Sequence, residues 1–122
     1  MEIKFERTDA AAIFILNGRI DSFGSSQLDN AIKTRITADD RIVIFDMAHV
    51  PYISSVGIRV FYAFEKMLHQ KNRYQYLCTV QPEVKNILEI TGFHRIFTLC
   101  STTEEALNLS RTTDSPAGSR IK

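Results

Sequence analysis

The sequence of 122 residues has no tryptophan, only two cysteines and no long apolar run. None of its apolar runs approaches the roughly 20 residues that a membrane-spanning helix needs, and the first residues lack the pattern of a signal peptide. We therefore expect a cytoplasmic protein with no membrane segment. Cys78 and Cys100 have no His at metal-ligand spacing, so both are interpreted as reduced, structural thiols.

The sequence also lacks an excess of charge of either sign. Its 15 Lys and Arg against 14 Asp and Glu give a net charge of +1, and the basic residues form no dense cluster. This balance gives no support to nucleic-acid binding. With 44% apolar and 24% charged residues, the composition is ordinary for a single domain that buries its own core.

Motifs that would indicate an enzyme are absent as well. The chain has no Gly-x-Ser-x-Gly elbow, no Walker loop and no Gly-x-Gly-x-x-Gly fingerprint. His49, His69 and His94 do not have the spacing to a serine and an acid that argues for a catalytic triad. We therefore expect neither a catalytic residue nor a metal or cofactor.

The stretch 41–68 is the most informative part of the chain. Residues 41–46 are an apolar run flanked by charge, which is typical of a strand buried on both faces. Apolar residues then return at the spacing of one helix face, at Val60, Phe61, Phe64, Met67 and Leu68. Ser54 and Ser55 therefore lie at a helix N-terminus, where a serine can cap a backbone N–H or carry phosphate. Neither serine begins a capping box.

The remaining elements follow from similar patterns. Further strands are expected at 2–7, as an edge strand, and at 11–16, 74–80 and 96–99; further helices are expected after Asp21 and Ser22 with an apolar stripe from Leu28 to Ile36, from Pro82 to Gly92, and over 103–111. These elements predict an α/β domain over 1–111, with a mixed, mostly parallel sheet of about five strands and about four helices. We expect a mobile tail at 112–122 and find no internal repeat.

Several segments of the chain together resemble the STAS domains of bacterial anti-sigma factor antagonists. The strand end at 44–46, the lead-in at 50–53 and the serine turn at 54–59 carry the resemblance. Two flanking features agree with it, namely the Gly-x-Ile-Asp turn within 16–21 and the Pro-initiated helix within 80–93, which ends in Thr-Gly-Phe.

Placed residue by residue, the family's phosphorylatable serine falls on Ser55. The best-known members have Asp in place of Ser54, and Ser, Thr or Ala in place of Val56. The resemblance implies partner switching, in which the unphosphorylated domain binds an anti-sigma factor that is also a serine kinase. Phosphorylation of Ser55 would release the domain, and a serine phosphatase would restore it. The residues expected to contact the partner are Asp21, Ser22, Ser54, Val56, Gly57 and Arg59.

Two alternatives remain open at the level of sequence. The first is a STAS-like module that only scaffolds or senses, in which Ser55 is a helix cap and is never phosphorylated. Ser54 in place of Asp is the feature that keeps this alternative open. The second is binding of a nucleotide or a lipid in a cleft beside the serine turn.

Overall fold

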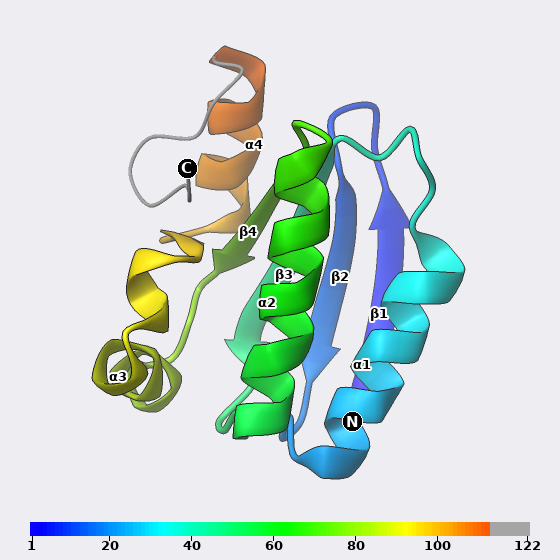
Figure 1. The fold of residues 1–122 in the computed structure, drawn as a ribbon. Helices are drawn as coiled ribbons and strands as arrows, with labels where there is room; N and C mark the ends of the chain where they lie inside the picture. Colours follow the sequence, from blue (N-terminus) through cyan, green and yellow to red (C-terminus); the bar gives the residue numbers. More distant parts are fainter. Residues whose placement is uncertain (113–122) are drawn as a thin grey trace.

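The computed structural model describes residues 1–112 as one five-stranded sheet and its helices (Figure 1). The strands are β1 (Glu2–Arg7), β2 (Ala12–Asn17), β3 (Ile42–His49), β4 (Tyr74–Cys78) and β5 (Thr98–Cys100). The helices are α1 (Ser22–Arg35), α2 (Ser55–Gln70), α3 (Pro82–Thr91) and α4 (Thr103–Thr112), with a short 3-10 helix, η1 (Phe93–Arg95). The strands follow the order β1-β2-β3-β4-β5, antiparallel between β1 and β2 and parallel elsewhere. The predicted fold class is confirmed.

The two faces of the sheet are covered unequally. Helices α1 and α2 lie side by side across one face (Figure 1), whereas α4 contacts β3, β4 and β5. Because side chains alternate along a strand, Phe14 and Phe45 enter the core beneath α1 and α2, while Ile13 and Ile44 enter the core that includes Ala106 of α4. The first core is held by aromatic contacts, such as the stacked rings of Phe14 and Phe45, whose centroids are 5.1 Å apart.

Strand β3 is longer than its apolar run predicted. The expected end at residue 46 is wrong, because the strand continues to His49 and there pairs with Asn17 of β2, beyond an irregularity in the register. Met47 is fully buried on the face of the sheet that α1 and α2 cover. Because of these extra residues, β3 ends level with β2. The turns that follow the two strands therefore lie at the same end of the sheet.

The ends of β4 and β5 also differ from the prediction. β4 stops at Cys78 and not at residue 80, because Thr79 takes a left-handed conformation with φ of 55° that turns the chain out of the sheet. β5 begins only at Thr98, since Ile96 closes η1 with a backbone hydrogen bond to Phe93. Phe97 lies within the core and Ile96 packs against it, but neither joins a strand. Their apolar character indicated burial and was wrongly interpreted as a strand.

The two C-terminal helices agree closely with their sequence signals. α3 begins at Pro82 and ends at Thr91, and its C-cap Gly92 has a φ of 82° in the left-handed region. At the start of α4 the Glu105 N–H donates to Thr102 Oγ1 at 3.0 Å, and the Ser101 N–H donates to Glu105 Oε1 at 2.9 Å. The tail expected at 112–122 lies outside the described residues, apart from Thr112, which is the last residue of α4.

The two cysteines occupy neighbouring positions on β4 and β5. Cys78 and Cys100 are free and buried, and they are paired in register across the two parallel strands. A hydrogen bond with Cys100, together with burial, raises the pKa of the Cys78 thiol. Within residues 1–112 no helix has both the length and the apolar character needed to cross a membrane.

Candidate functional site

The candidate site is built where the turns after β2 and β3 run side by side. The Gly18 N–H donates to the carbonyl of His49 at 3.0 Å, and the Ile20 N–H donates to the carbonyl of Tyr52 at 2.9 Å. The Ser54 N–H returns a bond to the carbonyl of Ile20 at 2.8 Å. These bonds fix the start of α1 beside the start of α2, so the structure brings the predicted Asp21 and Ser54 turns together.

Each helix is capped by the residue that precedes it. Asp21 Oδ1 accepts from the Gly24 N–H at 2.8 Å at the start of α1. Ser54 Oγ accepts from the Gly57 N–H at 3.1 Å at the start of α2. The serine that caps α2 is therefore Ser54, and the interpretation of Ser55 as the helix cap is wrong.

Ser55 is the first residue of α2 and its side chain faces solvent. Ser54, by contrast, is half-buried, and its hydroxyl also lies 3.5 Å from the Ser25 hydroxyl. Arg59 is exposed four residues after Ser55, on the same side of the helix. The structure thus leaves the Ser55 hydroxyl open to solvent and holds the Ser54 hydroxyl inside the turn.

Gly57 faces inward and has no room for a side chain. A Cβ at this position would lie 2.6 Å from Ile20 Cγ2 and 2.9 Å from Ile53 Cγ1, and both isoleucines are buried. Because such contacts are far inside van der Waals separation, the glycine allows α2 to start directly against the turn after β2. This position therefore serves packing between the two turns, and Gly57 is not part of the exposed surface.

The local charge favours an anion on Ser55. The first turn of α2 contains no acidic residue, so the unpaired N–H groups and the positive end of the helix dipole are not matched by a carboxylate there. A phosphate on Ser55 would occupy that position and would lie within one helical turn of Arg59.

Three further residues of the site were missed by sequence analysis. The Arg19 guanidinium stacks 4.2 Å from the centroid of the Tyr52 ring and joins the two turns on their outer side. Ser25 is buried and donates from its hydroxyl to the carbonyl of Asp21 at 2.6 Å. Phe23, the second residue of α1, is 71% exposed. No short-range pattern identifies Arg19 or Ser25. Phe23, by contrast, lies two residues after the capping Asp21 and before the apolar stripe of the helix begins at Leu28, and this position was a usable signal.

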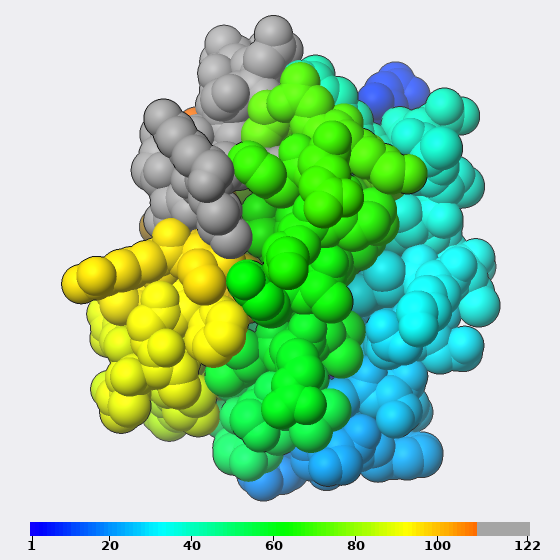
Figure 2. Space-filling model, in the orientation of Figure 1, coloured from blue at the N-terminus to red at the C-terminus, as the bar shows by residue number. Residues whose placement is uncertain are grey.

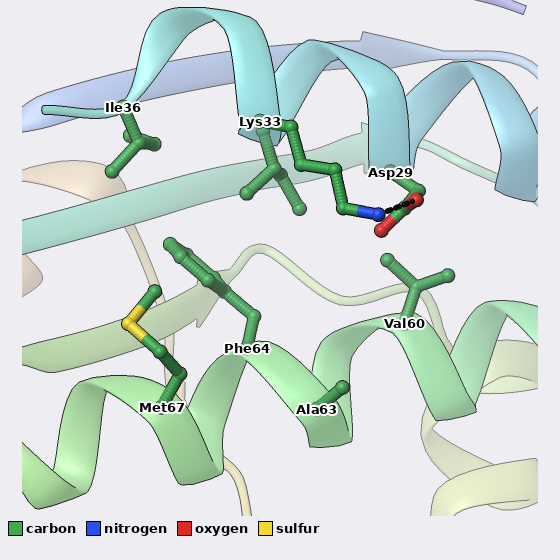
Figure 3. A pocket seen from close by; sticks show the side chains of 8 residues that line it. Asp29, Lys33, Ile36, Val60, Ala63, Phe64 and Met67 are labelled. Carbon is green, nitrogen blue, oxygen red and sulfur yellow. Dashed lines mark ion pairs between the residues drawn. The ribbon is translucent and has the colours of Figure 1, made fainter.

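A separate groove lies between α1 and α2, away from the serine turn. Its volume is about 330 Å³, and its lining comes from Ile32 of α1 and Ile36 just after it, and from Val60, Phe64 and Met67 of α2, with Ala63 at its side. Figure 3 shows Val60, Phe64 and Met67 reaching from α2 toward α1, where Lys33 and Asp29 form an ion pair at 2.8 Å. The lining suits an apolar group better than a phosphate. Among residues 1–112 no cluster of His, Cys, Asp and Glu could hold a metal ion.

The fold and the exposed serine turn define a small α/β domain that presents a helix N-terminus at one edge. The chain belongs to the STAS domain family, whose sequence model matches residues 2–106. The BtrV protein of Bordetella bronchiseptica, named provisionally as an anti-sigma factor antagonist, is 31% identical over 106 residues, which are 87% of this chain and 91% of that protein.

Solved structures share the fold at lower identity. An anti-sigma factor antagonist from Mycobacterium paratuberculosis has a TM-score of 0.81 at 22% identity, over 90% of this chain and 93% of that one. The Bacillus cell fate determinant SpoIIAA in its phosphorylated form has a TM-score of 0.68 at 18% identity, over 88% and 97%. The predicted family is confirmed.

Proposed function

We propose that this protein is an anti-sigma factor antagonist that acts in the cytoplasm by partner switching, with Ser55 as its phosphorylation site. The unphosphorylated domain binds an anti-sigma factor that is also a serine kinase, and so frees the sigma factor. The names of the relatives support the antagonist function, and the existence of SpoIIAA in a phosphorylated form supports control by phosphate. The single observation that carries the proposal is the exposed Ser55 at the first position of α2, beside the buried cap Ser54.

The covalent step takes place on the antagonist, which is a substrate and not a catalyst. The kinase transfers the γ-phosphoryl group of ATP to Ser55 Oγ, so that the new P–O bond replaces the bond to ADP and the hydroxyl proton is lost. A serine phosphatase hydrolyses the phosphoserine with water and restores the hydroxyl. The contact surface around Ser55 consists of the exposed Asp21, Ser22, Val56 and Arg59 together with the half-buried Ser54. Gly57 is buried and supports this surface from below, through the packing of the two turns.

Phosphorylation weakens the complex more than it changes the domain. A phosphate adds about −1.5 to −2 charges, but at a helix N-terminus that charge is tolerated or stabilising. In the complex the same charge lies in an interface shaped for a neutral hydroxyl. A 100-fold loss of affinity corresponds to about 2.7 kcal/mol, and an unmatched charge buried in an interface costs at least that much.

The test is phosphosite mapping by mass spectrometry on the protein purified from its own cells, with Ser55→Ala as the control. We expect phosphate on Ser55, and no phosphorylation of this turn in the variant. Phosphate on Ser54 would move the site by one residue. A chain that stays unmodified after incubation with the purified anti-sigma kinases of the same bacterium and ATP would overturn the proposal and favour a scaffold.

A ligand-sensing module is the second candidate, and the groove between α1 and α2 is the observation that favours it. An apolar ligand held there by the native state raises the melting temperature by mass action. A thermal shift screen with medium-chain fatty acids and nucleoside triphosphates separates the two ligand classes. We expect the fatty acids to raise the melting temperature more, because among the described residues the only charged groups in the groove lining are Lys33 and Asp29, which already pair with each other.

A further inference from the structure

The two turns of the site repeat one five-residue pattern. Each contains, in order, an isoleucine, a capping residue, a serine, an apolar residue and a glycine: Ile20-Asp21-Ser22-Phe23-Gly24 and Ile53-Ser54-Ser55-Val56-Gly57. Ile20 and Ile53 pair in an isolated parallel bridge, and in both turns the glycine N–H donates to the capping side chain. The repeat is too short to stand out in the sequence, but it makes the two turns equivalent position by position.

The equivalence places an exposed apolar side chain second in each helix. Phe23 is 71% exposed in α1, and Val56 is 40% exposed in α2. Within the described part of the chain, Ile90 of α3 is the other large apolar side chain of this kind, at 77%. In the space-filling view the segments around 20–24, in blue, and around 53–57, in green, adjoin at the lower edge of the molecule (Figure 2).

Folding does not account for Phe23. Phe has a lower helix propensity than Ala, and a side chain left mainly in water contributes little through burial. Asp21 and Gly24, its neighbours in the turn, are by contrast fixed by the cap and by close packing, since a Cβ on Gly24 would lie 2.5 Å from the carbonyl oxygen of Arg19. An exposed aromatic side chain on such a rigid turn has the properties of a binding anchor.

We propose that Phe23 is the apolar anchor by which this protein binds its anti-sigma factor, with Val56 extending the contact toward Ser55. The inference rests on the proposed function and deepens it, because it adds a residue and a chemistry to the partner surface. The partner should offer an apolar pocket for the Phe23 ring. Acidic groups at its rim would face the exposed Arg19 and Arg59 on the antagonist.

This surface also explains how one phosphate can act on the complex. Ser22 and Ser55 immediately precede Phe23 and Val56, so each apolar contact adjoins a hydroxyl. A phosphate on Ser55 brings charge and bound water to the edge of this apolar contact. Because the contact contributes affinity only when water is excluded from it, the phosphate weakens binding. The kinase would also use Phe23 to hold the antagonist while it modifies Ser55.

The test compares Phe23→Ala with Ile90→Ala, which removes an equally exposed apolar side chain from a helix away from the serine turn. Each purified serine-kinase anti-sigma factor of the same bacterium is titrated with the 122-residue chain by calorimetry. We expect Phe23→Ala to weaken binding at least about tenfold, and Ile90→Ala to stay within about twofold of the wild type. Phe23→Leu, which keeps an apolar side chain, should retain most of the affinity.

The outcomes separate this inference from the function on which it rests. If the wild type binds a kinase and Phe23→Ala binds it equally well, Phe23 is not an anchor, while the proposed function stands. If the wild type binds none of these kinases, the proposed function fails and the anchor fails with it. A wild-type dimer that Phe23→Ala dissociates in sedimentation, together with unchanged kinase binding, would assign Phe23 to contacts between copies of the chain.

Discussion

Ser54 and Ser55 are adjacent and chemically identical, yet the fold gives them opposite environments. Ser54 accepts the Gly57 N–H and lies near the Ser25 hydroxyl within the turn, whereas Ser55 starts α2 in solvent. The first residue has a structural function and the second is accessible to an enzyme. A pair of alanine variants can therefore separate the two functions.

Removal of the Ser54 hydroxyl should destabilise the protein, and removal of the Ser55 hydroxyl should not. Ser54→Ala loses the N-cap of α2, which lowers the free energy of unfolding by about 1 kcal/mol. Ser55→Ala changes a solvent-facing side chain and should stay within about 0.5 kcal/mol of the wild type. Urea denaturation followed by circular dichroism measures both, and a larger loss in Ser55→Ala would show that Ser55 is the cap.

Gly57→Ala tests the close contact of the two turns. Its Cβ would overlap buried methyl groups of Ile20 and Ile53, which costs about 1 to 3 kcal/mol, while Ala in place of Gly in a helix returns up to about 1 kcal/mol. We expect a net loss of about 1 to 2 kcal/mol in the free energy of unfolding, measured by urea denaturation.

The matched control is Gly92→Asn at the end of α3. Nothing lies within 4 Å of a Cβ at Gly92, and its φ of 82° is a conformation that Asn tolerates. This variant should lose less than about 1 kcal/mol. If both glycines prove equally replaceable, the turns are not as tightly packed as the distances indicate.

Residue-scale features of the site were only partly predictable. The resemblance proposed Ser55 as the phosphorylation site, but local sequence could not choose the cap of α2, because both serines are good capping residues. The choice is made by the bond between the Ser54 N–H and the Ile20 carbonyl, a contact between segments 34 positions apart. The pairing of Arg19 with Tyr52 escaped prediction for the same reason.

Among the helices and strands, β1 and the segments that lead into β3 and β4 are linked by hydrogen bonds to Asp40, at the end of the sheet opposite the site. Arg7 of β1 donates from Nε and from Nη2 to the two carboxylate oxygens of Asp40, at 2.8 and 2.7 Å. The Thr37 N–H donates to the same carboxylate at 2.8 Å, and Arg73 Nε donates to the Asp40 carbonyl at 2.8 Å. One buried aspartate thus ties together β1, the connection from α1 to β3, and the chain just before β4.

This arrangement predicts a pH-dependent stability. The hydrogen bonds from Arg7 lower the pKa of Asp40, so the charged carboxylate favours the folded state. The contribution is complete above the unfolded pKa of about 3.9 and disappears as pH falls through the lower folded pKa. Asp40→Asn should therefore lose about 1 to 3 kcal/mol at pH 7, and its difference from the wild type should shrink below about pH 4.

The control for Asp40→Asn is Asp29→Asn. Asp29 forms an exposed ion pair with Lys33 one helical turn away, and such pairs contribute little. Urea midpoints at pH 7, 5, 3 and 2 should change slightly and evenly for this control. An Asp40→Asn deficit that stays constant from pH 7 to pH 2 would show that the carboxylate charge is not what fastens these elements.

The ends of helices and strands were predictable where residues at the end itself determine them, and less predictable where pairing with adjacent strands determines them. The Pro82 start and Gly92 end of α3 depend on backbone chemistry that the sequence displays directly. The ends of β3, β4 and β5 depend on pairing with adjacent strands and on the left-handed turn at Thr79. An apolar run such as 96–99 shows burial without showing whether the backbone joins a ladder.

At the scale of the whole molecule, the sheet separates the Asp40 connection from the serine turn, so stability and binding can be altered independently. The proposed partner surface lies where β2 and β3 end and α1 and α2 begin, and the Asp40 contacts lie at the other ends of these elements. Sequence and resemblance predicted this architecture, and the structure places the turns at 21–22 and 54–59 side by side. Sequence and resemblance did not predict the exposed Phe23, because the apolar stripe from which the helix was predicted begins only at Leu28.

Phosphorylation of Ser55 should leave the free domain folded. Because the first turn of α2 has no acidic residue, phosphate on Ser55 meets the positive end of the helix dipole and lies one turn from Arg59. The phosphorylated monomer should be as stable as the unphosphorylated one, or more stable by about 0.3 to 1 kcal/mol. Amide chemical shifts should then change around 53–59 and remain unchanged in β1, β4 and β5.

Affinity for the anti-sigma factor should at the same time fall at least about 100-fold, so that binding and stability change in opposite directions. Calorimetry on the two forms and thermal melts of each measure the two quantities separately. A phosphorylated form that unfolds, or whose shifts change throughout the sheet, would mean that phosphate acts by rearranging the domain. A stable monomer with lost affinity would instead place the whole effect of the phosphate in the interface.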